Sequence, residues 1–222
     1  MGIITVEKAK DLLWLGRYSE RVYTTIQTFF IAFDRLIEAE EEKYKEFCKR
    51  VDVPDVYGSK EVFLKNYPFD RDNPDSILSN LYRAYDNAVF LRHEIGSETL
   101  AYIELAIYDM KKAKDSKAPL IEMQTVLDHL LAFWGCVDDC IDSSNVRDMI
   151  KTGRRIERLD LYLRFEMDND LLHREVTKLK SRIERTELKY DKEKLEYLVT
   201  MIEENHINYH EGVREIESLV EM

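Results

Sequence analysis

The chain contains very few residues that can reverse its direction. Of its 222 residues, 7 are glycine and 4 are proline, less than half of the roughly 12% that these two residues occupy in an average protein. A sheet of many short strands needs frequent turns, whereas long helices need few. Because 45% of the residues are hydrophobic, the chain can also form a sizeable core. These features predict an all-α fold built from long helices.

Apolar residues near the start of the chain recur at helical spacing and form one stripe, made of Leu15, Val22, Ile26, Phe29, Phe33 and Leu36. We expect a first helix from Thr5 to about Arg50, and an irregular segment over 51–73, where two prolines and a glycine occur. Cap and stop residues then predict helices from Asn73-Pro74 to about Gly96, from Ser97 to about Lys114, from Pro119 to about Asp142, and over about 145–167, 171–188 and 191–222.

The short connections between these helices predict one domain over residues 1–222. Six or seven helices joined in this way form a single up-and-down bundle. The segment 173–222 is densely charged, which indicates a helical arm that packs on one side of the bundle.

A sequence pattern occurs twice, on the first and on the fifth predicted helix. Residues 11–22 read DLLWLGRYSERV and residues 148–159 read DMIKTGRRIERL, with Asp, Gly, Arg, Glu and Arg at identical spacing. We call this the repeated motif. It predicts a duplicated helical unit, or two helices that meet around a pseudo-two-fold axis.

Each copy of the repeated motif places a glycine one helical turn before a glutamate. A glycine inside a helix costs about 1 kcal/mol relative to alanine, so Gly16 and Gly153 indicate that another backbone or a ligand comes close. Glu20 and Glu157 flank the apolar stripe and are expected to be partly buried, which requires a charged partner. Arginines lie on the adjacent line of each helix, at Arg17, Arg21, Arg154 and Arg158.

Two interpretations of this cluster stay open. It is either an ion-pair network that locks two central helices, or a charged pocket for a zwitterion, a carboxylate or a phosphate. Four nearby cations oppose a raised carboxyl pKa, so acid–base catalysis by the two glutamates alone is disfavoured.

Three stretches resemble the alpha-E family of all-helical bacterial and archaeal proteins. Trp14-Leu15-Gly16-Arg17-Tyr18-Ser19-Glu20-Arg21 is similar to the family's opening W-L-G-R-Y-x-E-R signature. Asn73-Pro74-Asp75-Ser76-Ile77, with Asn87 and Arg92 downstream, resembles its N-P-x-S-I and A-R-E-N-A-R-x-x-R segments, although Tyr85 and Val89 replace two arginines. The stretch from Gly153 to Asp160 resembles a second G-R-x-x-E-R-x-D block.

The resemblance implies an accessory role and no known activity. Family members are typically encoded beside ATP-grasp-type ligases and transglutaminase-like proteins, which implies a binding component of a system that forms or trims peptide amide bonds. The expected ligand is a peptide, an amino-acid-like molecule or a partner protein. The residues expected to bind it are Gly16, Arg17, Glu20, Arg21, Gly153, Arg154, Glu157, Arg158, Asn87 and Arg92. An enzyme that uses the same Glu/Arg cluster on amide bonds is the alternative, although no phosphate-binding loop or nucleophile elbow is present.

A metal-binding bundle is a second alternative. Glu203 and His206 have the E-x-x-H spacing of helical di-metal sites, and His210 would share a helix face with His206. The nearest second pair, Asp170 and His173, has the shorter acid, so we expect a solvated terminal helix and no cofactor. Two thiols four positions apart, Cys136 and Cys140, are expected to be buried rather than to form a redox or metal pair.

Charge and cysteine content restrict the classes of partner and the cellular compartment that the sequence predicts. The formal net charge is −11, so the basic footprint that nucleic acids require is missing. The apolar runs are too short to span a membrane. Three cysteines without the spacing of a secreted scaffold, and a start that does not resemble a signal peptide, predict a cytoplasmic protein. The sequence leaves homo-oligomer formation open.

Overall fold

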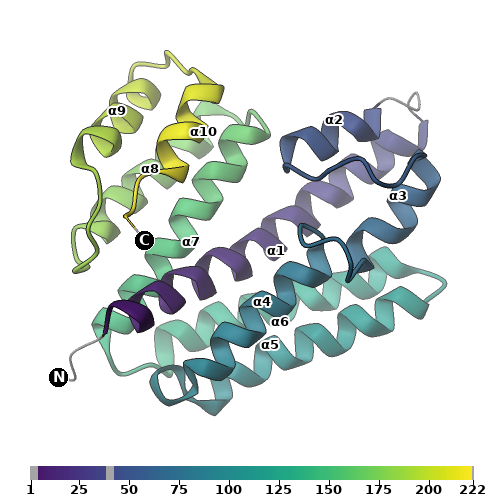
Figure 1. Cartoon of the computed structure of the whole chain (residues 1–222), viewed down its shortest axis with the longest axis horizontal. Coiled ribbons are helices and arrows are strands. Elements are labelled where there is room, and N and C mark those ends of the chain that lie inside the picture. Colours follow the sequence, from purple (N-terminus) through teal and green to yellow (C-terminus); the bar gives the residue numbers. More distant parts are fainter. Residues whose placement is uncertain (1–4, 39–42, 222) are drawn as a thin grey trace. The chain divides into compact units, whose positions relative to one another are not determined.

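The computed structural model describes residues 5–38 and 43–221. Over these ranges the chain forms ten α-helices and one short 3-10 helix (Figure 1). This confirms the all-α fold, but the described part of the chain holds more helices than the six or seven predicted. The chain divides into two compact units. The split unit consists of Met1–Glu20 and Ile141–Met222, and the inserted unit consists of Arg21–Cys140.

The split unit combines the beginning of α1 (Val6–Glu38) with four helices from the end of the chain: α7 (Ser144–Arg164), α8 (Asn169–Ile183), α9 (Lys192–Glu203) and α10 (Tyr209–Glu217). Helix α10 packs against both α7 and α9. Leu13 of α1 joins side chains of α7, such as Ile156, in one apolar core. The charged segment 173–222 contributes most of its apolar side chains to this core, among them Val176, Leu198 and Ile216.

The inserted unit holds the rest of α1, then α2 (Lys43–Arg50), α3 (Lys60–Asn66), the 3-10 helix η1 (Tyr67–Phe69), α4 (Ile77–Phe90), α5 (Arg92–Asp115) and α6 (Pro119–Asp139). Helices α5 and α6 pack along each other. An aromatic cluster fills the unit where α1, α2, α3 and η1 meet, with Phe29, Phe47, Phe63 and Tyr67 in ring contact. Aromatic pairs of this kind stabilise a core beyond the effect of their buried area.

The apolar stripe of α1 behaves as its spacing predicts. Leu15, Val22, Ile26 and Phe29 are fully buried, whereas Phe33 is half-buried and the side chain of Leu36 lies outside the described part of the chain. The single helix expected from Thr5 to about Arg50 is instead two helices, α1 and α2. Residues 39–42 between them lie outside the described residues.

Three other boundaries differ from the prediction. The segment 51–73 contains α3 and η1, so it is less irregular than expected. The cap of α4 is Ser76, whose side chain accepts a hydrogen bond from the Ser79 amide, whereas Asn73 turns the chain three residues earlier. The helix expected over 191–222 is interrupted, because Asn205 has a positive φ of 55° and Asn208 caps a new helix.

The cap predicted at Asp191 and the break predicted at 143–145 are confirmed. Asp191 caps α9 and Ser143 caps α7 through side-chain hydrogen bonds to backbone amides, which satisfy donors that the first turn of a helix leaves unpaired. The break predicted at Gly96 is displaced, because α4 ends at Phe90 and α5 begins at Arg92, whereas Gly96, with a φ of 80°, only kinks α5. Within the described ranges, the helices lack the combination of length and apolarity that crossing a membrane demands.

Candidate functional site

The two copies of the repeated motif meet where α1 crosses α7 in the split unit. A Cβ atom built on Gly16 would lie 1.9 Å from the carbonyl oxygen of Ile150, and one built on Gly153 would lie 2.0 Å from that of Leu13. Leu13 and Ile150 hold the same position in the two copies, three residues before the glycine. The crossing therefore has the reciprocal contacts of a two-fold axis, and the two backbones touch through both glycines.

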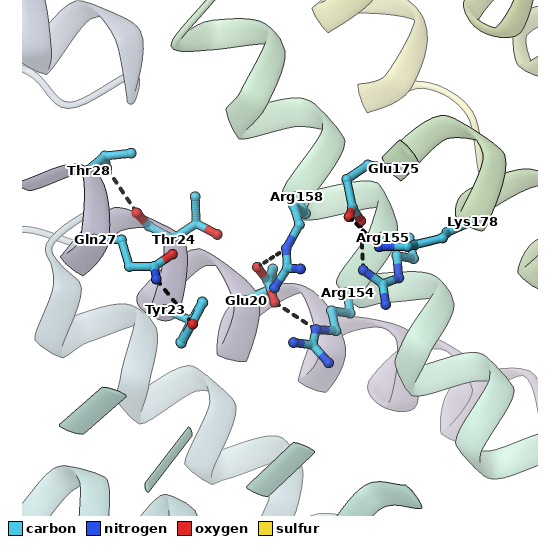
Figure 2. A network of polar contacts seen from close by, with 10 residues as sticks. All are labelled: Glu20, Tyr23, Thr24, Gln27, Thr28, Arg154, Arg155, Arg158, Glu175 and Lys178. Atoms are coloured by element: carbon cyan, nitrogen blue, oxygen red, sulfur yellow. Dashed lines mark hydrogen bonds and ion pairs between the residues drawn. The ribbon is translucent and has the colours of Figure 1, made fainter. Parts of the chain in front are cut away.

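Ion pairs next to the glycines connect the two helices, and Figure 2 shows those that Glu20 makes with Arg154 and Arg158. Arg17 Nε donates to Glu157 Oε2 at 2.7 Å, and the equivalent Arg154 Nε donates to Glu20 Oε2 at 3.0 Å. Arg158 Nε adds a third contact, 2.6 Å from Glu20 Oε1. The sequence predicted arginines within reach of the glutamate on their own helix, whereas these pairs run from each helix to the other.

These charges are buried more deeply than the sequence predicted. The side chains of Glu20 and Glu157 are 0% and 1% exposed, and that of Arg17 is 7% exposed. The effective cost of burying an unpaired ion is several kcal/mol, so removing either partner leaves a strongly unfavourable charge. The geometry is that of the ion-pair network, one of the two interpretations left open by the sequence.

Aromatic contacts hold Arg17 in place. Its guanidinium carbon lies 4.7 Å from the centroid of the Trp14 ring, within the range of a cation–π contact. Trp14 in turn stacks on Tyr18, with ring centroids 4.9 Å apart. Arg17 is therefore fixed by an indole on its own helix and by a carboxylate on α7.

A second set of charges lies between α7 and α8 (Figure 2). Arg155 Nη1 is 2.6 Å from Glu175 Oε2, and Lys178 Nζ is 3.0 Å from Glu175 Oε1. Burial would raise the pKa of Glu175, but the charge of Arg155 and the hydrogen bond from Lys178 outweigh it and hold the pKa below its ordinary value. Arg182 of α8 pairs with Asp148, the first residue of the motif in α7.

Lys151 lies among these cations. Burial, followed by the positive charges of Arg182, Arg154 and Arg155, lowers the pKa of its amine to about 8. A lysine with such a pKa is partly neutral at neutral pH, unlike an ordinary lysine. No sequence pattern distinguishes Lys151 from the other lysines, because its low pKa depends on the packing of α7 and α8.

A cleft of about 290 Å³ opens beside the crossing, between the start of α1, the start of α7 and two segments near the end of the chain. Backbone hydrogen bonds from Glu221 to Lys189 and from Asp191 to Leu219 join these two segments. Apolar and charged residues line the cleft together: Val6, Ala9, Leu13, Met149, Leu188 and Val220, with Lys10, Lys189, Glu187 and Glu221.

Comparison with protein families now identifies the fold family. A family model for Alpha-E, described as a predicted alpha-helical domain with a conserved ER motif, matches residues 7–203. The chain belongs to the Alpha-E family. Its repeated motif contains a Glu-Arg pair in each copy, Glu20-Arg21 and Glu157-Arg158. Comparisons with curated proteins and with solved structures find no match.

The other predicted binding residues of this alpha-E chain belong to the inserted unit. Arg21 is half-buried on α1, and Asn87 is half-buried on α4. Arg92 is exposed at the start of α5 and donates from Nε to Ser97 Oγ at 3.0 Å. A role of these three residues in binding stays a prediction.

The alternative metal candidates near the end of the alpha-E chain, Glu203, His206 and His210, do not share a helix. Helix α9 ends at Glu203, His206 lies in the segment between α9 and α10, and His210 is on α10. All three are exposed. The E-x-x-H spacing therefore does not place Glu203 and His206 on one helix face, and His206 does not share a face with His210, because the positive φ of Asn205 ends the helical geometry.

The two thiols of α6 also differ from the prediction. Cys136 is buried, but Cys140 is exposed at the end of the helix. The carboxylate of Glu98 on α5 lies beside both, and the three potential ligand atoms are all within 4.8 Å of one another. The sequence contained no signal for Glu98, because only the packing of α5 on α6 brings it to the thiols.

Proposed function

We propose that this alpha-E protein is a non-catalytic binding component of a system that forms or trims peptide amide bonds. Its ligand, a short peptide or an amino-acid-like molecule, would occupy the cleft of the split unit. The observation that supports this proposal is the lining of the cleft. An apolar floor that includes Leu13 and Met149 is combined with two lysines and two glutamates, which complement the apolar side chain and the two charged ends of a zwitterion.

The volume of the cleft restricts the class of ligand. At about 290 Å³ it is just below the roughly 300–1,000 Å³ typical of sites for drug-sized ligands. A single amino acid or a dipeptide suits that space, whereas a nucleotide with its triphosphate does not.

The repeated motif positions two residues that line the cleft. Leu13 lines the cleft, and its carbonyl oxygen lies 2.0 Å from the position that a Cβ on Gly153 would take. Met149 also lines the cleft. The next residue, Ile150, makes the equivalent contact on the other side, because its carbonyl oxygen would lie 1.9 Å from a Cβ on Gly16. We therefore propose that the glycines and the Arg/Glu pairs fix the floor of the cleft, and that Lys10 and Lys189 bind the ligand's carboxylate.

An enzyme that acts through Glu20 and Glu157 receives less support. Both side chains are almost fully buried, and arginines of the opposite helix hold them. A general acid or base must come within about 3 Å of the proton that it transfers. A substrate cannot reach these two carboxylates without separating α1 from α7.

The proposed ligand class can be tested with dipeptides that differ only at their ends. We would titrate the purified chain with leucyl-phenylalanine and with its N-acetylated, C-amidated form, and measure binding by calorimetry. The free dipeptide should bind at least about tenfold more tightly, which corresponds to about 1.4 kcal/mol. Lys10→Gln and Lys189→Gln should each reduce that preference, because each removes one cation from the lining.

Lys192→Gln is the matched control, because Lys192 is an exposed lysine of the same unit that does not line the cleft. Its binding should equal that of the unchanged chain. Equal affinity for the free and the blocked dipeptide, or unchanged binding after both lining substitutions, would contradict the proposed function.

We further propose that the partner is an ATP-grasp-type ligase or a transglutaminase-like protein in the cytoplasm. The sequence resemblance supports the partner assignment, and three cysteines without the spacing of a secreted scaffold support the cytoplasmic location. Size-exclusion chromatography with light scattering, on the chain alone and mixed with an ATP-grasp-type ligase from the same host, tests the partner. A stable complex is expected, and the run without ligase also reveals any homo-oligomer. Separate elution at micromolar concentration of both proteins would count against the partnership.

A further inference from the structure

Two thiols and a carboxylate form a compact cluster at one end of the α5–α6 pair. Cys136 lies in the last turn of α6, and Cys140 is the residue that directly follows the helix. Because they are four positions apart, their side chains share one face, and the Sγ atoms are 3.2 Å apart. Glu98 of α5 completes the cluster, with all three potential ligand atoms within 4.8 Å of one another.

The chemistry of the cluster suits a thiophilic divalent cation. Zn²⁺ is bound in proteins by thiolates, imidazoles and carboxylates. Burial, the hydrogen bond with Cys140 and the charges of Cys140, Glu98 and Asp139 raise the pKa of Cys136 to about 12. A bound cation is stabilised by the same negative charges that disfavour a lone thiolate.

The distances also favour a metal over a direct sulfur–sulfur bond. Tetrahedral Zn²⁺ with Zn–S bonds of about 2.3 Å separates two sulfurs by roughly 3.8 Å, about 0.6 Å more than the observed 3.2 Å. A disulfide has a sulfur–sulfur bond of about 2.05 Å, so the two sulfurs would have to approach each other by about 1.15 Å from the observed 3.2 Å. That movement is nearly twice the roughly 0.6 Å that the metal requires. Cys140 lies beyond the last helical residue, where the backbone can adjust more easily than within α6.

We propose that Cys136, Cys140 and Glu98 form a Zn²⁺ site with two thiolate ligands, one carboxylate ligand and a fourth position open to water. Metal binding would release the two thiol protons to the solvent. Access fits this assignment, because Cys140 and Glu98 are exposed while Cys136 is 8% exposed. The site would connect α5 to the end of α6, and it is independent of the function proposed for the split unit.

The third cysteine of the chain supplies a matched control. Cys48 is a buried thiol on α2, and burial together with the charge of Asp55 raises its pKa to about 12. It therefore resembles Cys136 in burial and pKa, but it is not part of the cluster of ligand atoms.

The test uses the full chain without a histidine tag, stripped with a chelator and kept reduced by a phosphine. Titration with Co²⁺ should produce a thiolate-to-cobalt charge-transfer band that saturates at about one ion per chain and disappears when Zn²⁺ is added. Cys48→Ser should leave the band unchanged. Cys136→Ser and Cys140→Ser should each lose at least about tenfold in affinity, and Glu98→Gln should weaken binding while the band remains.

Circular dichroism of each variant checks that its helical content is retained, and the exposed Cys140 and Glu98 serve as sites whose substitution leaves the core untouched. Loss of the band in Cys48→Ser, or an unchanged band in Cys140→Ser, would overturn the proposal. So would a reduced chain that binds no Co²⁺ while its oxidised form loses two hydrogens in mass, because that result would identify a redox pair instead.

Discussion

Substituting alanine for Gly16 should destabilise the fold, although alanine is the better helix former. Helix propensity alone would stabilise the variant by about 1 kcal/mol. However, the new Cβ would lie 1.9 Å from the carbonyl oxygen of Ile150 and 2.9 Å from its carbonyl carbon. Both are backbone atoms, so no rotation of a side chain can relieve the contact.

The magnitude follows from how far the helices must separate. Close C···O contacts in proteins are about 3.3 Å, so α1 and α7 must move apart by roughly 1.4 Å at this point. Such a shift stretches the ion pairs of Arg17, Arg154 and Arg158, now 2.6–3.0 Å long, beyond hydrogen-bonding distance. Overpacking costs about 1–3 kcal/mol and a broken buried ion pair about 3–5 kcal/mol. The lower ends of these two ranges, less the propensity gain of about 1 kcal/mol, give a net loss of about 3 kcal/mol.

Denaturation by urea, followed by circular dichroism, measures this loss, which corresponds to a melting temperature about 6–12 °C lower. Gly135→Ala is the control, because Gly135 also lies within a helix but its Cβ would meet nothing within 4 Å. That substitution should stabilise the chain by about 0.5–1 kcal/mol. Gly16→Ala together with Gly153→Ala should cost less than the sum of the two, since one separation relieves both contacts. If Gly16→Ala were as stable as the unchanged chain, the close crossing would be refuted.

Three further predictions concern the charges of the split unit. Glu157→Gln leaves Arg17 buried without its counter-charge, so urea denaturation should show a loss of about 3–5 kcal/mol, and a loss below 1 kcal/mol would contradict the buried pair. Competitive amine labelling with mass spectrometry should give Lys151 a pKa near 8, with roughly a quarter of the amine neutral at pH 7.5 against about 0.1% for an ordinary lysine. Because the folded pKa of Glu175 is lowered, its pair with Arg155 should stabilise the fold fully above about pH 4.5 and less as the pH falls through the folded value. The stability difference between the unchanged chain and Glu175→Gln should therefore shrink between pH 5.5 and pH 3.5.

The all-α fold was predictable because its signals are local. These signals are the scarcity of turn residues, the stripe through Leu15 and Ile26, and the cap at Asp191, and each depends only on neighbouring positions. The interruption at Asn205 was missed because asparagine adopts a positive φ only in some contexts. The helices within 51–73 were missed because η1 is one short turn that contains Pro68, which reads as a loop signal when tertiary packing is unknown.

The crossing was partly predictable because the motif is repeated. Two glycines at equal positions indicated a close approach, and the glutamates were expected to need arginine partners. The sequence could not show whether each arginine pairs with the glutamate of its own helix or with that of the other helix. Arg17 and Glu20 have the spacing of a pair within one helix, and only the packing of α1 on α7 makes Glu157 the partner of Arg17. The cleft and Glu98 were missed for the same reason. Leu13 and Val220 of the cleft are separated by most of the chain, and no periodicity connects them.

The long separation between the two halves of the crossing also sets an order of events during synthesis. Arg17 and Glu157 are 140 positions apart, so at about 5–20 residues per second roughly 7–28 s pass between their appearance. During that interval the inserted unit can fold around its own aromatic cluster, while the first copy of the motif lacks the second copy with which it pairs. Charged groups remain hydrated during such a wait, so this end of the nascent helix is less prone to aggregate than a purely apolar contact surface would be. The split unit is thus completed by a contact between α1 and α7 in which the charged residues of α1 stay hydrated until α7 has been synthesised.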